Sequence, residues 1–152
     1  MQIGNRYSKG IAAVEMTLVL PVLLFIFIAI TDAGRMMYAS ITNSSAARNA
    51  AGYGAQSSAH AVDSNGIETI ALGDAVNLEI DANNTSHVDV TSRRFCRCPG
   101  SSTEVSCTAN ACPTTTQIYV EVTTTRDFRT IIDYPGIPDQ VALTDTAEMR
   151  VQ

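Results

Sequence analysis

The chain has 152 residues, of which 45% are hydrophobic and 16% are charged, with 15 acidic residues against 10 basic ones. That length suits one small domain, or one domain with an anchor, and excludes a large multidomain enzyme. The formal net charge of −5 argues against a nucleic-acid-binding protein, which needs a basic surface to neutralise phosphates. The low charged fraction argues against a disordered chain.

The apolar residues are concentrated near the amino terminus. Between Ile11 and Ile30, 17 of 20 positions are apolar, and the exceptions are Glu15, Thr17 and Pro21. A helix of this length, at about 1.5 Å per residue, crosses a hydrocarbon core of about 30 Å. The run therefore predicts a membrane-spanning helix.

The charges on either side of this run predict its orientation. Arg6 and Lys9 precede it, and the next basic residue is Arg35, a bias that places the amino terminus in the cytoplasm and the chain after about residue 31 outside. The run fits a cleaved secretory signal peptide, although residues 31–33 make a poor cleavage site, and it equally fits an uncleaved signal anchor. A third interpretation must account for Glu15, because a charge inside a membrane span is costly and usually has a partner or a function.

The position of Glu15 decides between these interpretations. A short basic leader ends at Gly10, and Glu15 is the fifth residue after it. This spacing resembles a type IV prepilin signal, and residues 10–21 resemble the opening of the TadE-like family of pilus-assembly pseudopilins, with Met16 where that family commonly has an aromatic residue. The resemblance implies cleavage between Gly10 and Ile11 by prepilin peptidase and pairing of Glu15 with a free α-amine. A charge pair in a low dielectric removes most of the cost of burying the carboxylate alone.

The same resemblance implies a function in assembly. The expected protein is a minor pilin or pseudopilin of a tight-adherence (Tad/Flp) pilus, which contributes to assembly, priming or capping and so to surface adhesion. Its implied partners are other pilin and pseudopilin subunits, prepilin peptidase and the inner-membrane pilus platform, and Glu15 and Pro21 are the expected assembly residues. The alternative is an extracytoplasmic binding protein held by an uncleaved signal anchor and not incorporated in a pilus.

Helical periodicity continues past the membrane segment. A stripe of mostly small residues recurs at spacings of three and four up to Gly54. Its members are Ala33, Met37, Ser40, Ser44, Ala47, Ala51 and Gly54. We expect this face to dock on the protein's own sheet or to pack against other subunits in a fibre. A second helix is expected over residues 66–80, with Ser64 or Asn65 as its cap.

After a predicted turn at residues 81–85, the chain alternates as strands do, around residues 88–90, 118–123 and 141–151. Helices first and strands afterwards predict an α+β fold. In this fold a pilin-like long N-terminal transmembrane helix continues into an amphipathic stem, which packs on an antiparallel sheet of three to four strands, with one further helix. The expected division is a leader at 1–10, a transmembrane segment at 11–31, a helical stem at 32–54 and an extracytoplasmic head at 55–152.

The four cysteines are Cys96, Cys98, Cys107 and Cys112. Their spacing fits zinc sites poorly, because zinc ligands pair across two to four residues. In a head outside the cytoplasm we expect two disulfides. A bond between Cys96 and Cys98, across a single residue, is disfavoured, which leaves two of the three possible connectivities open.

The rest of the sequence carries no recognisable catalytic motif, cofactor signature or phosphate-binding loop. His60 and His87 are expected on the surface. Arg93, Arg94 and Arg97 form a small basic cluster beside the cysteines, which is either a solvated strand face or a contact for an acidic partner. The sequence therefore predicts neither an enzyme nor a metal site.

Overall fold

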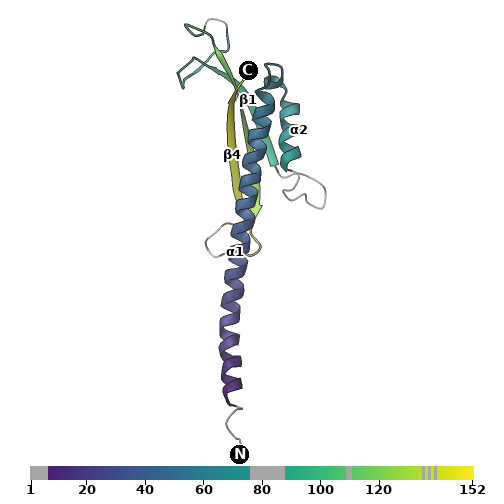
Figure 1. The fold of residues 1–152 in the computed structure, drawn as a ribbon, viewed down its shortest axis with the longest axis vertical. Coiled ribbons are helices and arrows are strands. Elements are labelled where there is room, and N and C mark those ends of the chain that lie inside the picture. Colours follow the sequence, from purple (N-terminus) through teal and green to yellow (C-terminus); the bar gives the residue numbers. More distant parts are fainter. Residues whose placement is uncertain (1–6, 76–87, 109–110, 135, 137, 139) are drawn as a thin grey trace, which may run out of the picture. The chain divides into compact units, whose positions relative to one another are not determined.

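The computed structural model describes residues 7–75, 88–108, 111–134, 136, 138 and 140–152 (Figure 1). Its helices are α1 (Tyr7–Gly54), the short 3-10 helix η1 (His60–Val62) and α2 (Ser64–Asp74), and its strands are β1 (Val88–Arg97), β2 (Glu104–Val105), β3 (Gln117–Arg129) and β4 (Gln140–Arg150). A long apolar first helix, one further α-helix and a four-stranded antiparallel sheet in the described part confirm the predicted α+β class.

The chain divides into two compact units, Met1–Met37 and Tyr38–Gln152, and helix α1 contributes residues to both. In the first unit, the large hydrophobic side chains between Val14 and Phe27 are all 45–71% exposed. By length and composition, α1 is able to cross a membrane. The hydroxyl of Thr17 donates to the Ala13 carbonyl at 2.7 Å, so this polar group is satisfied within the helix, as a lipid environment requires.

The second unit is built on a sheet with strand order β2-β1-β3-β4. Strand β3 is central, and its alternation separates two faces. Val120 and Val122 are fully buried, and Thr124 lies buried on the same face. The residues between them belong to the opposite face, where Thr123 lies beside Thr91 of β1 and Thr146 of β4.

Both α-helices of this unit cover the same face of the sheet (Figure 1). Ala47 and Ala51 of α1 and Ile67 of α2 form a core cluster with Val120 and Val122. Alanines bring the helix backbone close to the sheet because their side chains are short. Most of the core therefore consists of small residues, and its packing depends on close approach rather than on bulky side chains.

The buried face of α1 differs in part from the predicted stripe. Ala47, Ala51 and Gly54 are buried as expected, but Ala33 and Met37 are exposed. Ala33 precedes Ala51 by 18 residues, which is five full helical turns, so the two residues lie on the same side of α1. The difference is one of position along the helix: Ala33 and Met37 belong to the first compact unit, whereas Ala47, Ala51 and Gly54 belong to the second, which contains the sheet. The α1 residues buried in the second unit are Ala39, Asn43, Ala46, Ala47, Ala50, Ala51 and Gly54.

Helix α2 begins earlier than predicted. The helix occupies Ser64–Asp74, and its cap is Asp63, whose side chain accepts a hydrogen bond from the Gly66 backbone N–H. The prediction of Ser64 or Asn65 as the cap is therefore wrong, because aspartate caps a helix equally well and stands one residue earlier. The predicted end of this helix and the turn at residues 81–85 lie outside the described residues.

Candidate functional site

The predicted processing and assembly residues all fall within helix α1. Gly10 and Ile11 lie near its start, and the exposed Glu15 follows about one turn later. Glu15 is the only ionisable residue between Ile11 and Thr31. A lone carboxylate on an otherwise apolar helix surface is a group that a membrane environment leaves in need of a cationic or hydrogen-bonding partner.

Pro21 lies inside α1, where it lacks the N–H that would otherwise bond the carbonyl of Thr17, four residues earlier. The hydroxyl of Thr17 donates to the Ala13 carbonyl, so it does not take the place of the N–H that Pro21 lacks. The helix thus has a weakened point in its apolar half, six residues after Glu15. Such points in membrane helices are tolerated where neighbouring helices or side chains satisfy the freed carbonyl.

Asn43 joins α1 to the sheet in the second unit. Its side-chain Nδ2 donates to the backbone carbonyls of Thr124 and Leu143, each at 3.2 Å. The Thr124 hydroxyl donates in return to the Asn43 backbone carbonyl at 3.2 Å. Asn43 is 1% exposed, and its Oδ1 atom is buried without a hydrogen-bond partner. These hydrogen bonds fix both the position along the helix axis and the rotation of α1 on strands β3 and β4. The sequence analysis did not predict this contact. The available signal was an asparagine on an alanine-rich helix face.

A second polar contact closes the far end of α1. The Tyr53 hydroxyl donates to Asp63 Oδ2 at 2.9 Å, while Asp63 Oδ1 accepts from the Gly66 N–H at 3.0 Å. These hydrogen bonds, the Gly66 N–H foremost, hold the pKa of Asp63 below its ordinary value. The bond to Asp63 raises the pKa of Tyr53, because only the protonated, neutral hydroxyl can donate it and deprotonation would break it.

His60 belongs to this end of the molecule and is half-buried. Its ring meets the Tyr53 ring edge-on, with centroids 4.5 Å apart, and its Nδ1 lies 2.7 Å from the Ser57 hydroxyl oxygen. The Ser57 oxygen also accepts from the His60 backbone N–H at 3.2 Å. These bonds shape a local turn. His87 lies outside the described residues.

All four cysteines are bonded, as Cys96–Cys107 and Cys98–Cys112, with Cα atoms 5.2 and 5.5 Å apart. The sequence predicts two disulfides but leaves two connectivities open, and the fold has one of them. Both bonds fasten the connection between β1 and β3, which contains β2, to the end of β1.

The predicted basic cluster is engaged by carboxylates of this same chain. Arg93 of β1 bonds Glu121 of β3 through Nε at 2.6 Å and Glu104 of β2 through both terminal nitrogens, at 3.1 and 2.9 Å. This pairing raises the pKa of Arg93 and lowers that of Glu104. Arg94, the next residue along the strand, points to the opposite side of β1.

Arg97 extends the same network to the last strand. Its guanidinium forms an ion pair with Glu148 of β4 and lies over the rings of Phe95 and Tyr119, at 4.6 and 5.4 Å from their centroids. The two rings stack with centroids 5.6 Å apart, and Arg93 lies over Phe95 at 4.7 Å. Neither interpretation of the cluster from sequence foresaw this, because its carboxylates come from three different strands.

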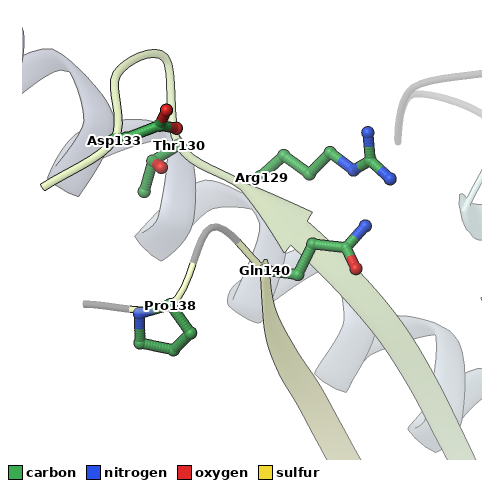
Figure 2. A pocket seen from close by; sticks show the side chains of 5 residues that line it. All are labelled: Arg129, Thr130, Asp133, Pro138 and Gln140. Atoms are coloured by element: carbon green, nitrogen blue, oxygen red, sulfur yellow. The ribbon is translucent and has the colours of Figure 1, made fainter. Parts of the chain in front are cut away.

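A polar pocket of about 600 Å³ lies at the connection between β3 and β4. Figure 2 shows its lining side chains: Arg129 at the end of β3, Gln140 at the start of β4, and Thr130, Asp133 and Pro138 on the segment between them. None of the processing, assembly or cysteine residues predicted from the sequence lines it. Within the described chain, no group of three or more His, Cys, Asp or Glu side chains is placed to hold a metal ion.

Together these features define a protein with a candidate membrane anchor and a disulfide-bonded α+β domain. Residues 10–52 match the family model described as TadE-like protein, which confirms the resemblance over this segment. Searches of curated proteins and of solved structures gave no match. The TadE-like segment indicates a protein related to the Tad pilus, with pilus-related partners in general. The match lies within helix α1, so the sheet and α2 are outside it.

Proposed function

We propose that this chain is a minor pilin or pseudopilin of a tight-adherence pilus and acts in its assembly, priming or capping. The observation that carries the proposal is the TadE-like match over residues 10–52, on a helix whose apolar side chains are exposed and whose membrane segment contains Glu15. In this function the protein binds and packs against other subunits and catalyses no reaction.

The proposed route begins with removal of the leader. The precursor lies in the cytoplasmic membrane with its amino terminus inside and its head outside, and prepilin peptidase cuts between Gly10 and Ile11. The new α-amine of Ile11 carries a positive charge, and Glu15 of the same or a neighbouring subunit pairs with it. The pair offsets most of the cost of holding the carboxylate in lipid.

The exposed residues of α1 beyond the membrane length support subunit packing. Met37, Tyr38 and Ile41 are 64%, 56% and 64% exposed. About 20 helical residues suffice to cross the hydrocarbon core, so a span that begins at Ile11 ends before these three. Large apolar side chains outside the bilayer are stabilised when a partner covers them, and neighbouring pilin helices are the partners proposed here.

The deciding measurement is the amino terminus of the protein recovered from the membrane fraction. We expect the mature chain to begin at Ile11, and Gly10→Val should leave the full-length precursor, whereas Gly4→Val within the leader should still be processed. A start near Ala33 would mean an ordinary secreted protein. An intact terminus that is indifferent to Gly10→Val would establish the alternative, a signal-anchored binding protein.

A second test separates insertion from assembly. Glu15→Ala should leave membrane insertion unchanged, or improve it, because a charge is removed from the span, yet reduce incorporation into pili at least tenfold. The neighbouring Met16→Ala is the matched control, since it alters side-chain size without altering charge. Normal piliation with Glu15→Ala would contradict the proposed pairing.

A further inference from the structure

The lengths of the loops that the disulfides close do not by themselves favour the observed connectivity. The native bonds join cysteines 11 and 14 residues apart, whereas the alternative, Cys96 with Cys112 and Cys98 with Cys107, would join cysteines 16 and 9 residues apart. The entropy of closing a loop grows only with the logarithm of its length. The two connectivities therefore cost nearly the same in an unfolded chain, and a folded contact must favour one.

The contact that distinguishes them is the seating of β2 on β1. Strand β2 contributes only two register pairs, Cys96 with Val105 and Arg97 with Glu104. When β2 is seated, Cys107 follows Val105 by two residues and is brought beside Cys96. A ladder this short holds its register weakly on its own.

Arg93 provides an additional contact that keeps β2 paired with β1. Its guanidinium grips both carboxylate oxygens of Glu104 at 3.1 and 2.9 Å and is itself anchored to the central strand through Glu121 at 2.6 and 3.1 Å. The planar fork of arginine satisfies two carboxylates at fixed angles, which a lysine ammonium does not reproduce. Phe95, stacked beneath the same guanidinium, fixes its orientation further.

We propose that Arg93 is a positioning residue for disulfide formation: by holding Glu104 against β1 and β3 while the thiols are reduced, it presents Cys107 to Cys96 and leaves Cys98 for Cys112. Each bond forms when two thiols lose two electrons and two protons to a disulfide oxidant, which is itself reduced to two thiols through a mixed disulfide. Arg93 takes no part in the electron transfer. It determines which pair of sulfurs meets first.

The test is reoxidation of the full-length chain in detergent. The protein is reduced in urea, transferred to glutathione buffer at low salt, quenched at early times by alkylation, and mapped by proteolysis and tandem mass spectrometry, where cleavage after Arg97 separates Cys96 from Cys98. Arg93→Gln and Glu104→Gln should each raise the share of Cys96–Cys112 and Cys98–Cys107 by about two- to fivefold, the range expected from losing an exposed ion pair. Arg93→Lys should give an intermediate share.

Two comparisons keep the outcome unambiguous. Arg94→Gln removes the same charge from the adjacent position and should pair its cysteines as the natural chain does. The natural chain itself should mispair more at 1 M salt than at low salt, because the Arg93 and Glu104 side chains are 50% and 46% exposed and are screened, while Arg93→Gln should show no such dependence. Equal early connectivity in all variants, or a salt effect that persists in Arg93→Gln, would overturn the proposal.

Discussion

At the scale of single residues, Gly66 illustrates a position whose identity is dictated by a neighbouring hydrogen bond. A Cβ atom at Gly66 would overlap the Asp63 carboxylate and come within 2.6 Å of the Tyr53 hydroxyl oxygen. Gly66→Ala should therefore break the Tyr53–Asp63 contact and the cap of α2, and lower the unfolding midpoint by about 5 °C. The measurement is thermal unfolding in detergent.

The matched control for this change is Gly73→Ala in the same helix, where a Cβ would meet nothing within 4 Å. Since alanine is the better helix former by about 1 kcal/mol, this variant should raise the midpoint. Equal effects of the two substitutions would contradict the steric account.

Asp63 gives the second prediction at this scale. The pKa of Asp63 is lowered in the folded chain, chiefly by the Gly66 N–H and then by the Tyr53 hydroxyl. The folded state therefore binds this proton less tightly than the unfolded state, so the stabilisation is complete above the ordinary carboxyl pKa of 3.8 and is lost as the pH falls through the lower folded value. Unfolding midpoints of Asp63→Asn should lie below those of the natural chain at pH 6, and the difference should shrink below about pH 4.

At the scale of elements, the docking of α1 depends on the absence of a side chain at Gly54. A Cβ there would lie 3.0 and 3.1 Å from the two Val120 methyl carbons and 3.3 Å from Ile67 Cδ1, and both residues belong to the buried core cluster. Gly54→Ala should push α1 from the sheet and cost about 1–3 kcal/mol of unfolding free energy.

Gly52→Ala, two residues earlier on the same helix, is the control because its Cβ would make only an ordinary contact with Met149 at 3.9 Å. Its unfolding free energy should be unchanged or slightly higher, since alanine favours helix. Urea unfolding of both variants, followed by circular dichroism, compares them directly. A loss at Gly52 as large as that at Gly54 would show that helix propensity, and not contact with Val120, governs this region.

At the scale of the whole molecule, different interactions stabilise the two units. In the proposed function, the exposed apolar residues of α1 from Val14 to Phe27 are stabilised by lipid, whereas the sheet is reinforced by the two disulfides. Reduction should lower the unfolding free energy of the second unit by about 3 kcal/mol for each bond and leave membrane association intact. Thermal unfolding with and without reductant measures the stability of the second unit, and carbonate extraction with and without reductant measures membrane association. Release of the reduced protein from membranes would contradict the prediction that membrane association does not depend on the disulfides.

The sequence by itself determined the features that depend on local pattern. Seventeen apolar positions between Ile11 and Ile30 specify a long helix, the alternation at Val120 and Val122 specifies a strand, and the spacing of Gly10 and Glu15 carries the family resemblance. These signals are read from neighbours along the chain, because helix and strand periodicity are properties of consecutive residues.

Only the tertiary structure decided which residues meet across elements. Asn43 reaches Thr124 and Leu143, 81 and 100 residues away, and Arg93 finds its carboxylates on two other strands. The disulfide connectivity belongs to the same class. Sequence spacing does not distinguish the two disulfide connectivities, because closing the corresponding loops costs nearly the same free energy. The pairing of β2 with β1 favours one of them, and the position of α1 on the sheet determines which residues Asn43 meets.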